Sequence, residues 1–103
     1  MGTERRLVVH VLKDRYDVYV GRPMPRFRLA GSKWRNPSRE WSADDYERYL
    51  LQDPLGRLLL ADILELRGRI LACWCAPKGG WIARRPFRCH GQVLAYYANK
   101  EPT

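Results

Sequence analysis

The stretch Arg69-Ile-Leu-Ala-Cys-Trp-Cys75 is nearly uninterrupted in apolar residues. Such a run is typical of a β-strand that is buried on both faces of a sheet. A basic, glycine-containing stretch, residues 76–88, follows it directly. The pattern predicts a central strand that ends at Cys75, and the rest of the chain is interpreted around it.

Two shorter β-rich runs lie near the start of the chain, at residues 7–12 and 17–21. Residues 13–16 separate them, a spacing that suits an antiparallel hairpin. Residues 22–40 contain three prolines and a glycine and show no sustained period, which predicts a long ordered loop. Loops of this length in a compact domain are usually functional or mobile.

Three helices are predicted from capping signals and apolar periodicity. Ser42 with Asp45 three residues later is a capping-box pattern and predicts a helix over about 43–51. Asp53 followed by Pro54 predicts a second helix that ends at Gly68. Its apolar face comprises Leu55, Leu58, Leu59, Ile63 and Leu66. A last helix follows Cys89-His90-Gly91 and carries Val93, Leu94 and Tyr97 as a buried stripe.

The first two helices lie between the second and the central strand and form a crossover, so those two strands should run parallel. We therefore expect an α/β fold, in which residues 1–103 form a single small, three-layer-like domain. Its short mixed sheet would combine the N-terminal hairpin with a parallel strand, packed by about three helices. A chain of 103 residues suits one domain.

The composition indicates a globular protein, with 46% hydrophobic and 29% charged residues. No apolar stretch approaches the roughly 18 residues that would span a bilayer, so a membrane partner is not expected and a cytoplasmic location is predicted. The chain has three cysteines, and two of them are neighbours on one strand. A disulfide scaffold is therefore a poor interpretation, and reduced thiols or a metal site are more natural.

The net charge of +8 is unevenly distributed. Residues 21–39 and 66–100 contain no acidic residue, whereas the acids lie mostly between these two segments. Both basic loops, 22–40 and 76–88, would leave the carboxyl ends of parallel strands. Open α/β sheets bind their ligands at that edge, so charge and topology predict one anion-binding rim.

Four residues with reactive or metal-binding side chains converge on this rim: Cys73, Cys75, Cys89 and His90. Cys73 and Cys75 are two apart on a strand and project from the same face. Cys89 and His90 begin the last helix, where free N–H groups stabilise a thiolate or a phosphate. The four have the ligand types of a Cys3His zinc site. Alternatively, Cys73 is a small core residue, and Cys89 and His90 are the catalytic pair.

The first basic loop offers further ligand-binding candidates. Phosphate or nucleotide contacts are predicted for Arg22, Ser32, Lys33, Trp34, Arg35, Asn36 and Gly91. These residues supply guanidinium, hydroxyl, ammonium and amide groups beside an indole that could stack on a base. The structural alternative is a turn in which Ser32 and Asn36 bond their own backbone and Trp34 covers the core edge. Trp74, Trp81 and His10 are interpreted as packing or surface residues.

Five blocks along the chain together resemble the DUF4326 family of small domains common in bacteria and phages. They are residues 18–22, 31–37, 64–68, 71–77 and 89–94. The family is one of unknown function, so the resemblance implies no catalytic roles. Its pattern usually has glycine at Arg35 and phenylalanine at Ser38, and its two cysteine blocks usually lie closer together than Cys75 and Cys89.

The leading hypothesis is a domain that binds or processes a nucleotide or nucleic acid, without a required cofactor. Any reaction would use a thiolate or a histidine, because the two basic loops contain no carboxylate except Glu40. A second hypothesis is a non-catalytic, zinc-stabilised adaptor that docks on nucleic acid or an acidic protein. A third is a stable scaffold whose partner and oligomeric state the sequence leaves open.

Overall fold

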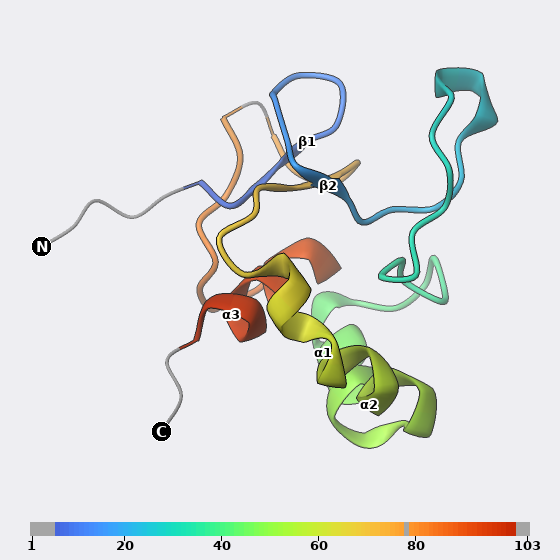
Figure 1. The fold of residues 1–103 in the computed structure, drawn as a ribbon, viewed down its shortest axis with the longest axis vertical. Coiled ribbons are helices and arrows are strands. Elements are labelled where there is room, and N and C mark those ends of the chain that lie inside the picture. Colours follow the sequence, from blue (N-terminus) through green and yellow to red (C-terminus); the bar gives the residue numbers. More distant parts are fainter. Residues whose placement is uncertain (1–5, 78, 101–103) are drawn as a thin grey trace, which may run out of the picture.

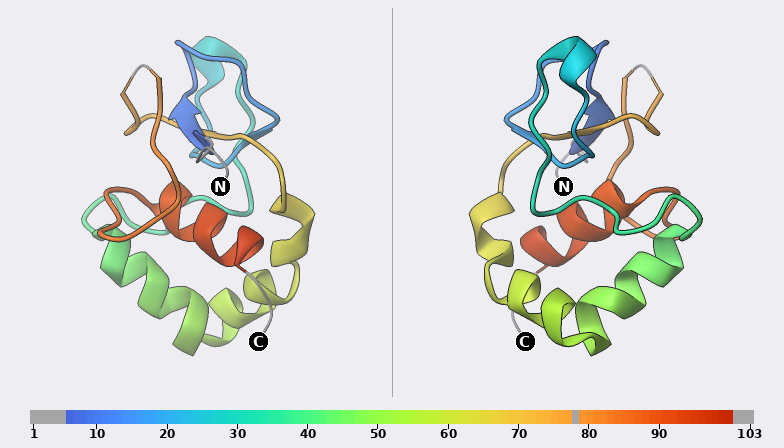
Figure 2. Two further views of the ribbon diagram at one scale, coloured as in Figure 1. Left: turned by 90° about the vertical axis from the view of Figure 1, so that its left-hand side faces the viewer. Right: turned by 90° about the vertical axis from the view of Figure 1, so that its right-hand side faces the viewer.

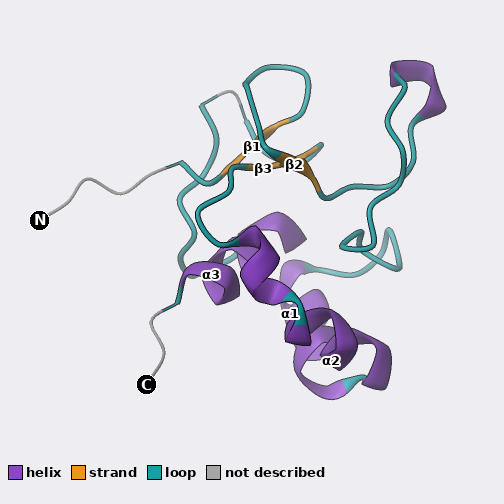
Figure 3. Cartoon of the chain, viewed as in Figure 1, coloured by secondary structure: helices purple, strands orange, loops and turns teal. Residues whose placement is uncertain are grey.

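The structure, a computed structural model, describes residues 6–77 and 79–100. The ends of the predicted 1–103 domain, and Lys78 of the second basic loop, lie outside the described residues. Three short strands form one sheet, in which β3 (Leu71–Cys73) lies between β1 (Val8–His10) and β2 (Val18–Tyr19) (Figure 3). Both outer strands run parallel to β3. The predicted central strand and its parallel pairing with the second strand are therefore confirmed, although β3 ends at Cys73 and not at Cys75.

The predicted N-terminal hairpin is wrong, because β3 separates β1 from β2. The amides of Lys13 and Asp14 instead donate to the carbonyl of His10, in a turn that ends β1. Each outer strand then pairs with one edge of β3, which satisfies the backbone of the buried strand on both sides.

The helices α1 (Ala43–Gln52) and α2 (Pro54–Ala61) begin where the capping signals predict. The Ser42 hydroxyl accepts from the amide of Asp45, and the Asp45 carboxylate accepts from the amide of Ser42. The Asp53 carboxylate caps α2 by accepting from the amide of Leu55 at 2.9 Å. A Cβ at Gly56 would lie 2.0 Å from the carbonyl oxygen of Tyr49, so glycine is required where α2 turns against α1.

The predicted second helix is shorter than expected. It ends at Ala61, and a 3-10 turn, η2 (Ile63–Leu66), follows. Ile63 and Leu66 are buried as the apolar face predicts, but Leu55 and Leu58 are 66% and 67% exposed. The break at Asp62 rotates the end of this apolar face toward the core and leaves its start in solvent.

The helices all lie on one side of the sheet, with α3 (His90–Asn99) next to it and α1 and α2 further away (Figures 1 and 2). Side chains of the helices and of β3 form the main core; its largest fully buried members are Tyr46, Leu50, Leu66, Leu71 and Leu94. The other face of the sheet packs against the first basic loop, which contains the 3-10 turn η1 (Pro25–Phe27). The third layer is thus a loop.

The α/β class with about three helices is therefore confirmed. Among the helices that the structure describes, none is long and apolar enough to cross a membrane.

Candidate functional site

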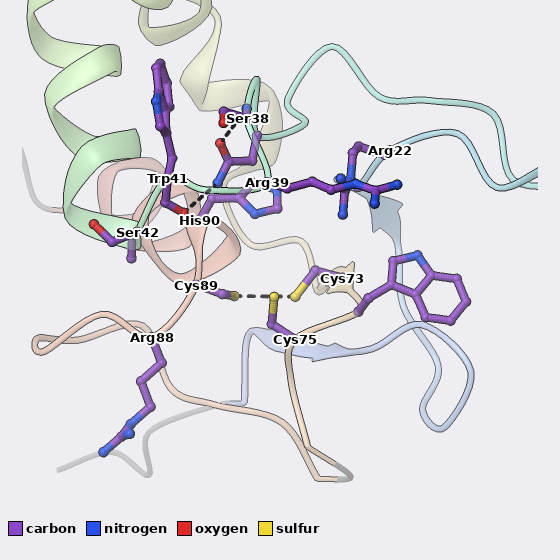
Figure 4. Close-up of a pocket in the computed structure, with 14 residues that line it drawn as sticks. Arg22, Ser38, Arg39, Trp41, Ser42, Cys73, Cys75, Arg88, Cys89 and His90 are labelled. Atoms are coloured by element: carbon purple, nitrogen blue, oxygen red, sulfur yellow. Dashed lines mark hydrogen bonds between the residues drawn. The ribbon is translucent and has the colours of Figure 1, made fainter.

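A pocket of about 170 Å³ lies at the carboxyl edge of the sheet (Figure 4). It is enclosed by the ends of β2 and β3, the start of α3 and the start of α1. Its lining residues are Gly21, Arg22, Asn36, Ser38, Arg39, Trp41, Ser42, Ala43, Cys73, Trp74, Cys75, Arg88, Cys89 and His90. None of the described residues that line it carries a carboxylate. Both basic loops and the reactive residues therefore meet at one place, at the edge that the sequence predicts.

The three cysteines of the chain converge on this pocket. Cys73 ends β3, Cys75 follows two residues later, and Cys89 is the N-cap of α3. The Sγ atoms of Cys73 and Cys89 lie 3.4 Å apart, and all three Sγ atoms lie within 4.8 Å of one another. Figure 4 shows the three sulfurs pointing toward a common centre.

The three thiols differ in burial and in acidity. Cys73 and Cys89 are 1% and 4% exposed, whereas Cys75 is exposed. Hydrogen bonds from Cys73 and then Cys89 lower the pKa of Cys75, and the charge of Arg22 acts in the same direction. Cys73 is hydrogen-bonded to Cys75, which raises the pKa of Cys73. The hydrogen bonds that Cys89 forms with Cys73 and Cys75 raise the pKa of Cys89. Cys75 is therefore the first of the three to ionise.

His90 lines the pocket but does not belong to the group of sulfurs. Its Nε2 lies 2.8 Å from the carbonyl oxygen of Val20, and its ring packs edge-on against Tyr46. Burial lowers the pKa of this imidazole. A neutral His90 that donates its Nε2–H to Val20 accounts for this geometry and ties the start of α3 to the end of β2.

Three arginines supply the positive charge of the pocket: Arg22 and Arg39 from the first basic loop, and Arg88 from the second. In the view of Figure 4, Arg22 and Arg39 lie on one side of the sulfurs. Arg88 lies on the other side, with its side chain pointing away from them. Within residues 6–77 and 79–100, no ion pair involves any of the three. Their charge is therefore not neutralised by a carboxylate of the described chain.

Polar side chains hold the two loops in place around the pocket. The Asn36 side chain accepts from the amide of Ser38 at 3.2 Å and donates to the carbonyl of Trp41. Gln92 of α3 accepts from the amide of Arg88 at 2.5 Å and donates to the carbonyl of Ile82 at 3.0 Å. These bonds tie each basic loop to the start of a helix and thereby position Arg39 and Arg88.

The structure brings together only part of the predicted set. Arg22, Asn36, Cys73, Cys75, Cys89 and His90 line the pocket. Gly91 is buried directly beneath it, where an added Cβ would lie 3.5 Å from the sulfur of Cys89 and 3.7 Å from that of Cys73. Its backbone thus approaches the thiols closely.

Four predicted ligand-binding residues lie outside the lining, and all four have partners within the protein. Lys33 forms ion pairs with Asp62 and Glu65 at 3.1 and 3.2 Å. Trp34 is 3% exposed. The Ser32 hydroxyl accepts from the amide of Trp34, and Arg35 donates to the carbonyl of Ser32. Residues 32–35 therefore form the turn of the structural alternative, in which Ser32 bonds the local backbone and Trp34 is buried at the core edge.

Sequence reasoning missed several residues of the lining: Ser38, Arg39, Trp41, Ser42 and Arg88. A usable signal was present for three of them. Arg39 is the last basic residue of the first loop, and Ser42 begins the helix directly after it. Arg88 immediately precedes Cys89. Residues at the junction of a basic loop and a helix start therefore contribute more to this site than residues in the middle of the loop.

These features define a small α/β protein with a thiol-lined pocket that three arginines surround. A family model described as a domain of unknown function, DUF4326, matches residues 8–100. The chain therefore belongs to the DUF4326 family, as its sequence blocks indicate.

Comparison with curated proteins yields a viral relative, "Uncharacterized protein R718" of Acanthamoeba polyphaga mimivirus. The two are 36% identical over a region that covers 76% of this chain. The chain spans 63% of the length of that relative. No solved structure matches the chain significantly.

Proposed function

We propose that the pocket binds the phosphate of a nucleotide, or of a nucleic-acid end, at the carboxyl edge of the sheet. One observation carries this proposal: the pocket lining formed by the described residues includes three arginines without ion-pair partners there, and no carboxylate. Arginine donors that are free of internal partners favour a planar or tetrahedral anion. The binding free energy then comes chiefly from charge-assisted hydrogen bonds.

The size of the pocket limits what it can enclose. Pockets that bury a whole drug-sized ligand measure about 300–1,000 Å³. At about 170 Å³, this pocket can enclose a phosphate or a single ring, but not a complete nucleotide. The remainder of the ligand would lie across the rim, where Trp41 and Trp74 offer aromatic surface.

The start of α3 supports an anionic ligand at the same place. This helix has ten residues, and Cys89 at its N-cap forms no side-chain cap. The first amide groups of a helix carry a partial positive charge and stabilise a negative group that lies close to the helix N-terminus. The helix start and the three arginines therefore favour the same sign of ligand charge.

A thermal-shift screen of nucleoside mono-, di- and triphosphates and inorganic phosphate tests this proposal, since a ligand that binds only the folded state raises its stability. We expect at least one to raise the melting temperature in a saturable manner, and Arg39→Ala and Arg22→Ala to reduce the shift. Arg57→Ala on α2 is the matched control, because Arg57 is exposed and does not line the pocket. No shift with any phosphate, or equal losses in all three variants, would contradict the proposal.

A second candidate is a non-catalytic, zinc-stabilised adaptor that docks on nucleic acid or an acidic protein. The observation in its favour is the close approach of the three sulfurs. This candidate predicts salt-dependent binding to generic DNA or RNA at low ionic strength. Removal of the metal would lower the stability of the fold, and Arg39→Ala would weaken binding no more than Arg57→Ala.

A further inference from the structure

We propose that Cys73, Cys75 and Cys89 bind one zinc ion as three thiolates and leave its fourth coordination position open to the pocket. This site differs from a closed Cys3His site, in which all four positions belong to the protein. The assignment rests on the proposed function only for the group that completes the coordination. The metal site itself follows from the three sulfurs.

The spacing of the sulfurs suits a tetrahedral metal. With Zn–S bonds of about 2.3 Å, two sulfurs of a tetrahedral site lie roughly 3.8 Å apart. The Sγ atoms of Cys73 and Cys89 lie 3.4 Å apart, and no pair of the three exceeds 4.8 Å. Shifts of a few tenths of an ångström to about one ångström would give the required triangle.

The sulfurs are held by rigid elements on two sides. Cys73 belongs to the central strand, whose two edges are paired, and Cys89 begins a ten-residue helix. Both side chains are buried, so the protein has already excluded water from two of the three ligands. Preorganised ligands reduce the entropy lost on binding, and thiolates favour zinc over magnesium or calcium.

Among the described residues, no side chain joins the sulfurs as a fourth ligand. The metal-binding group there contains the three cysteines alone, and neither ring nitrogen of His90 belongs to it. The lining of the pocket also contains no carboxylate. All three cysteines face the pocket, so the remaining position of the metal would face it too.

The charge of such a site agrees with its surroundings. Three thiolates and one Zn²⁺ carry a net charge of −1. Arg22, Arg39 and the N-terminal end of α3 lie on the pocket with the sulfurs and would offset that charge. The backbone of Gly91 lies next to the sulfurs, since an added Cβ would be in van der Waals contact with those of Cys89 and Cys73.

Three protein ligands and one open position are the arrangement of catalytic zinc sites. A water molecule or a Lewis-basic atom of the ligand would occupy the open position at the floor of the anion pocket. The metal would then act directly on the group that the arginines hold. Cys73, Cys75 and Cys89 are the only cysteines of the chain, so every metal–thiolate signal reports on this site.

Elemental analysis of the full chain tests the metal. The chain is produced with supplementary zinc and purified without chelators. We expect about one zinc per chain in the wild type, its loss in Cys75→Ser, and its retention in Arg57→Ala. An absence of stoichiometric metal in the wild type, or stoichiometric iron or copper in place of zinc, would overturn the assignment. If the cysteine variant does not fold, release of zinc from the wild type on titration of its three thiols with a mercurial gives the same information.

The open position is tested in the Co²⁺-substituted chain with azide as the probe. We expect the visible d–d bands of a tetrahedral site to shift saturably as azide is added. If the bands did not change on addition of azide, the metal site would be closed and the proposed open coordination position would be wrong. If the chain binds zinc but no phosphate raises its melting temperature, the metal site is supported and the proposed function is rejected. If a phosphate raises the melting temperature of a chain that binds no metal, the proposed function is supported and the metal site is rejected.

Discussion

The sulfur atoms of Cys73 and Cys89 lie 3.4 Å apart, although one residue ends the central strand and the other begins the last helix. This contact joins the carboxyl edge of the sheet to the start of α3. It also closes the long second basic loop between the two cysteines. The position of Arg88, directly before Cys89, follows from it. The stability and the chemistry of the site are therefore coupled.

The thiols should differ in reactivity when no metal is present. In chelator-treated protein, iodoacetamide should modify Cys75 well before the other two, because Cys73 and Cys89 are 1% and 4% exposed. Peptide mass spectrometry over a time course measures the order of modification. Equal rates at all three cysteines in folded protein would contradict the burial. The same experiment in urea is the control, and there the three rates should converge.

His90 should contribute to stability through its bond to Val20. In His90→Leu the buried carbonyl of Val20 loses its donor, which should lower the free energy of unfolding by about 1–3 kcal/mol. Urea denaturation measures this change. His10→Leu is the matched control, since His10 is less buried and its Nδ1 accepts only from the amide of Leu12. A loss in His90→Leu no larger than in the control would contradict the role of the Val20 bond.

Glu47 should make stability depend on acid pH. Hydrogen bonds from Arg85 lower the pKa of this carboxyl, and Tyr97 donates to it as well. Because the folded-state pKa is below the unfolded value of 4.5, the stabilisation is complete above that pH and is lost as the pH falls through the folded-state pKa.

The free energy of unfolding, measured by denaturation at a series of acid pH values, should therefore change less with pH for Glu47→Gln than for the wild type. The variant should also be less stable at neutral pH, where the wild-type carboxylate is ionised. Gln52→Ala on the same helix removes no titratable group, so it is the control and should keep the wild-type slope. If the free energy of unfolding fell equally with pH in the wild type and in Glu47→Gln, Glu47 would not be responsible for the loss of stability in acid.

Gly56 should not tolerate a side chain. In an exposed helix, alanine in place of glycine would stabilise by about 1 kcal/mol. Here the added Cβ would lie 2.0 Å from the carbonyl oxygen of Tyr49, so Gly56→Ala should instead destabilise the protein by about 1–3 kcal/mol or more.

Thermal and urea denaturation both report the cost at Gly56. Gly68→Ala is an informative comparison, because Gly68 has a φ of 76° but nothing within 4 Å of an added Cβ. Its cost should come from backbone strain alone, about 1–2 kcal/mol. A Gly56→Ala variant as stable as the wild type would mean that α2 does not pack against α1 this closely.

Local signals in the sequence predicted the helix starts and the central strand correctly. Ser42 with Asp45, and Asp53 with Pro54, act through hydrogen bonds that span two or three residues, so they can be interpreted without knowledge of the fold. The N-terminal hairpin could not be settled in this way. Strand pairing there depends on β3, which lies some sixty residues further along the chain.

The sequence predicted where the candidate site lies, but not all of the residues that form it. The two basic loops and the cysteines meet at the carboxyl edge because strand direction alone puts them there. Lys33 was expected at the pocket, yet its ammonium group binds Asp62 and Glu65. Those acids approach Lys33 only because the second helix breaks at Asp62, which its apolar period did not indicate.

The sequence by itself determined where the helices begin, which strand is central, and that the thiols share one edge of the sheet. These properties depend on interactions between near neighbours or on the direction of a strand. The tertiary structure alone decided that β1 and β2 flank β3, that His90 binds Val20, and that Arg22, Arg39 and Arg88 line the same pocket as the sulfurs. Such contacts join residues far apart in the chain, and alternatives of similar free energy are separated only when the whole core packs.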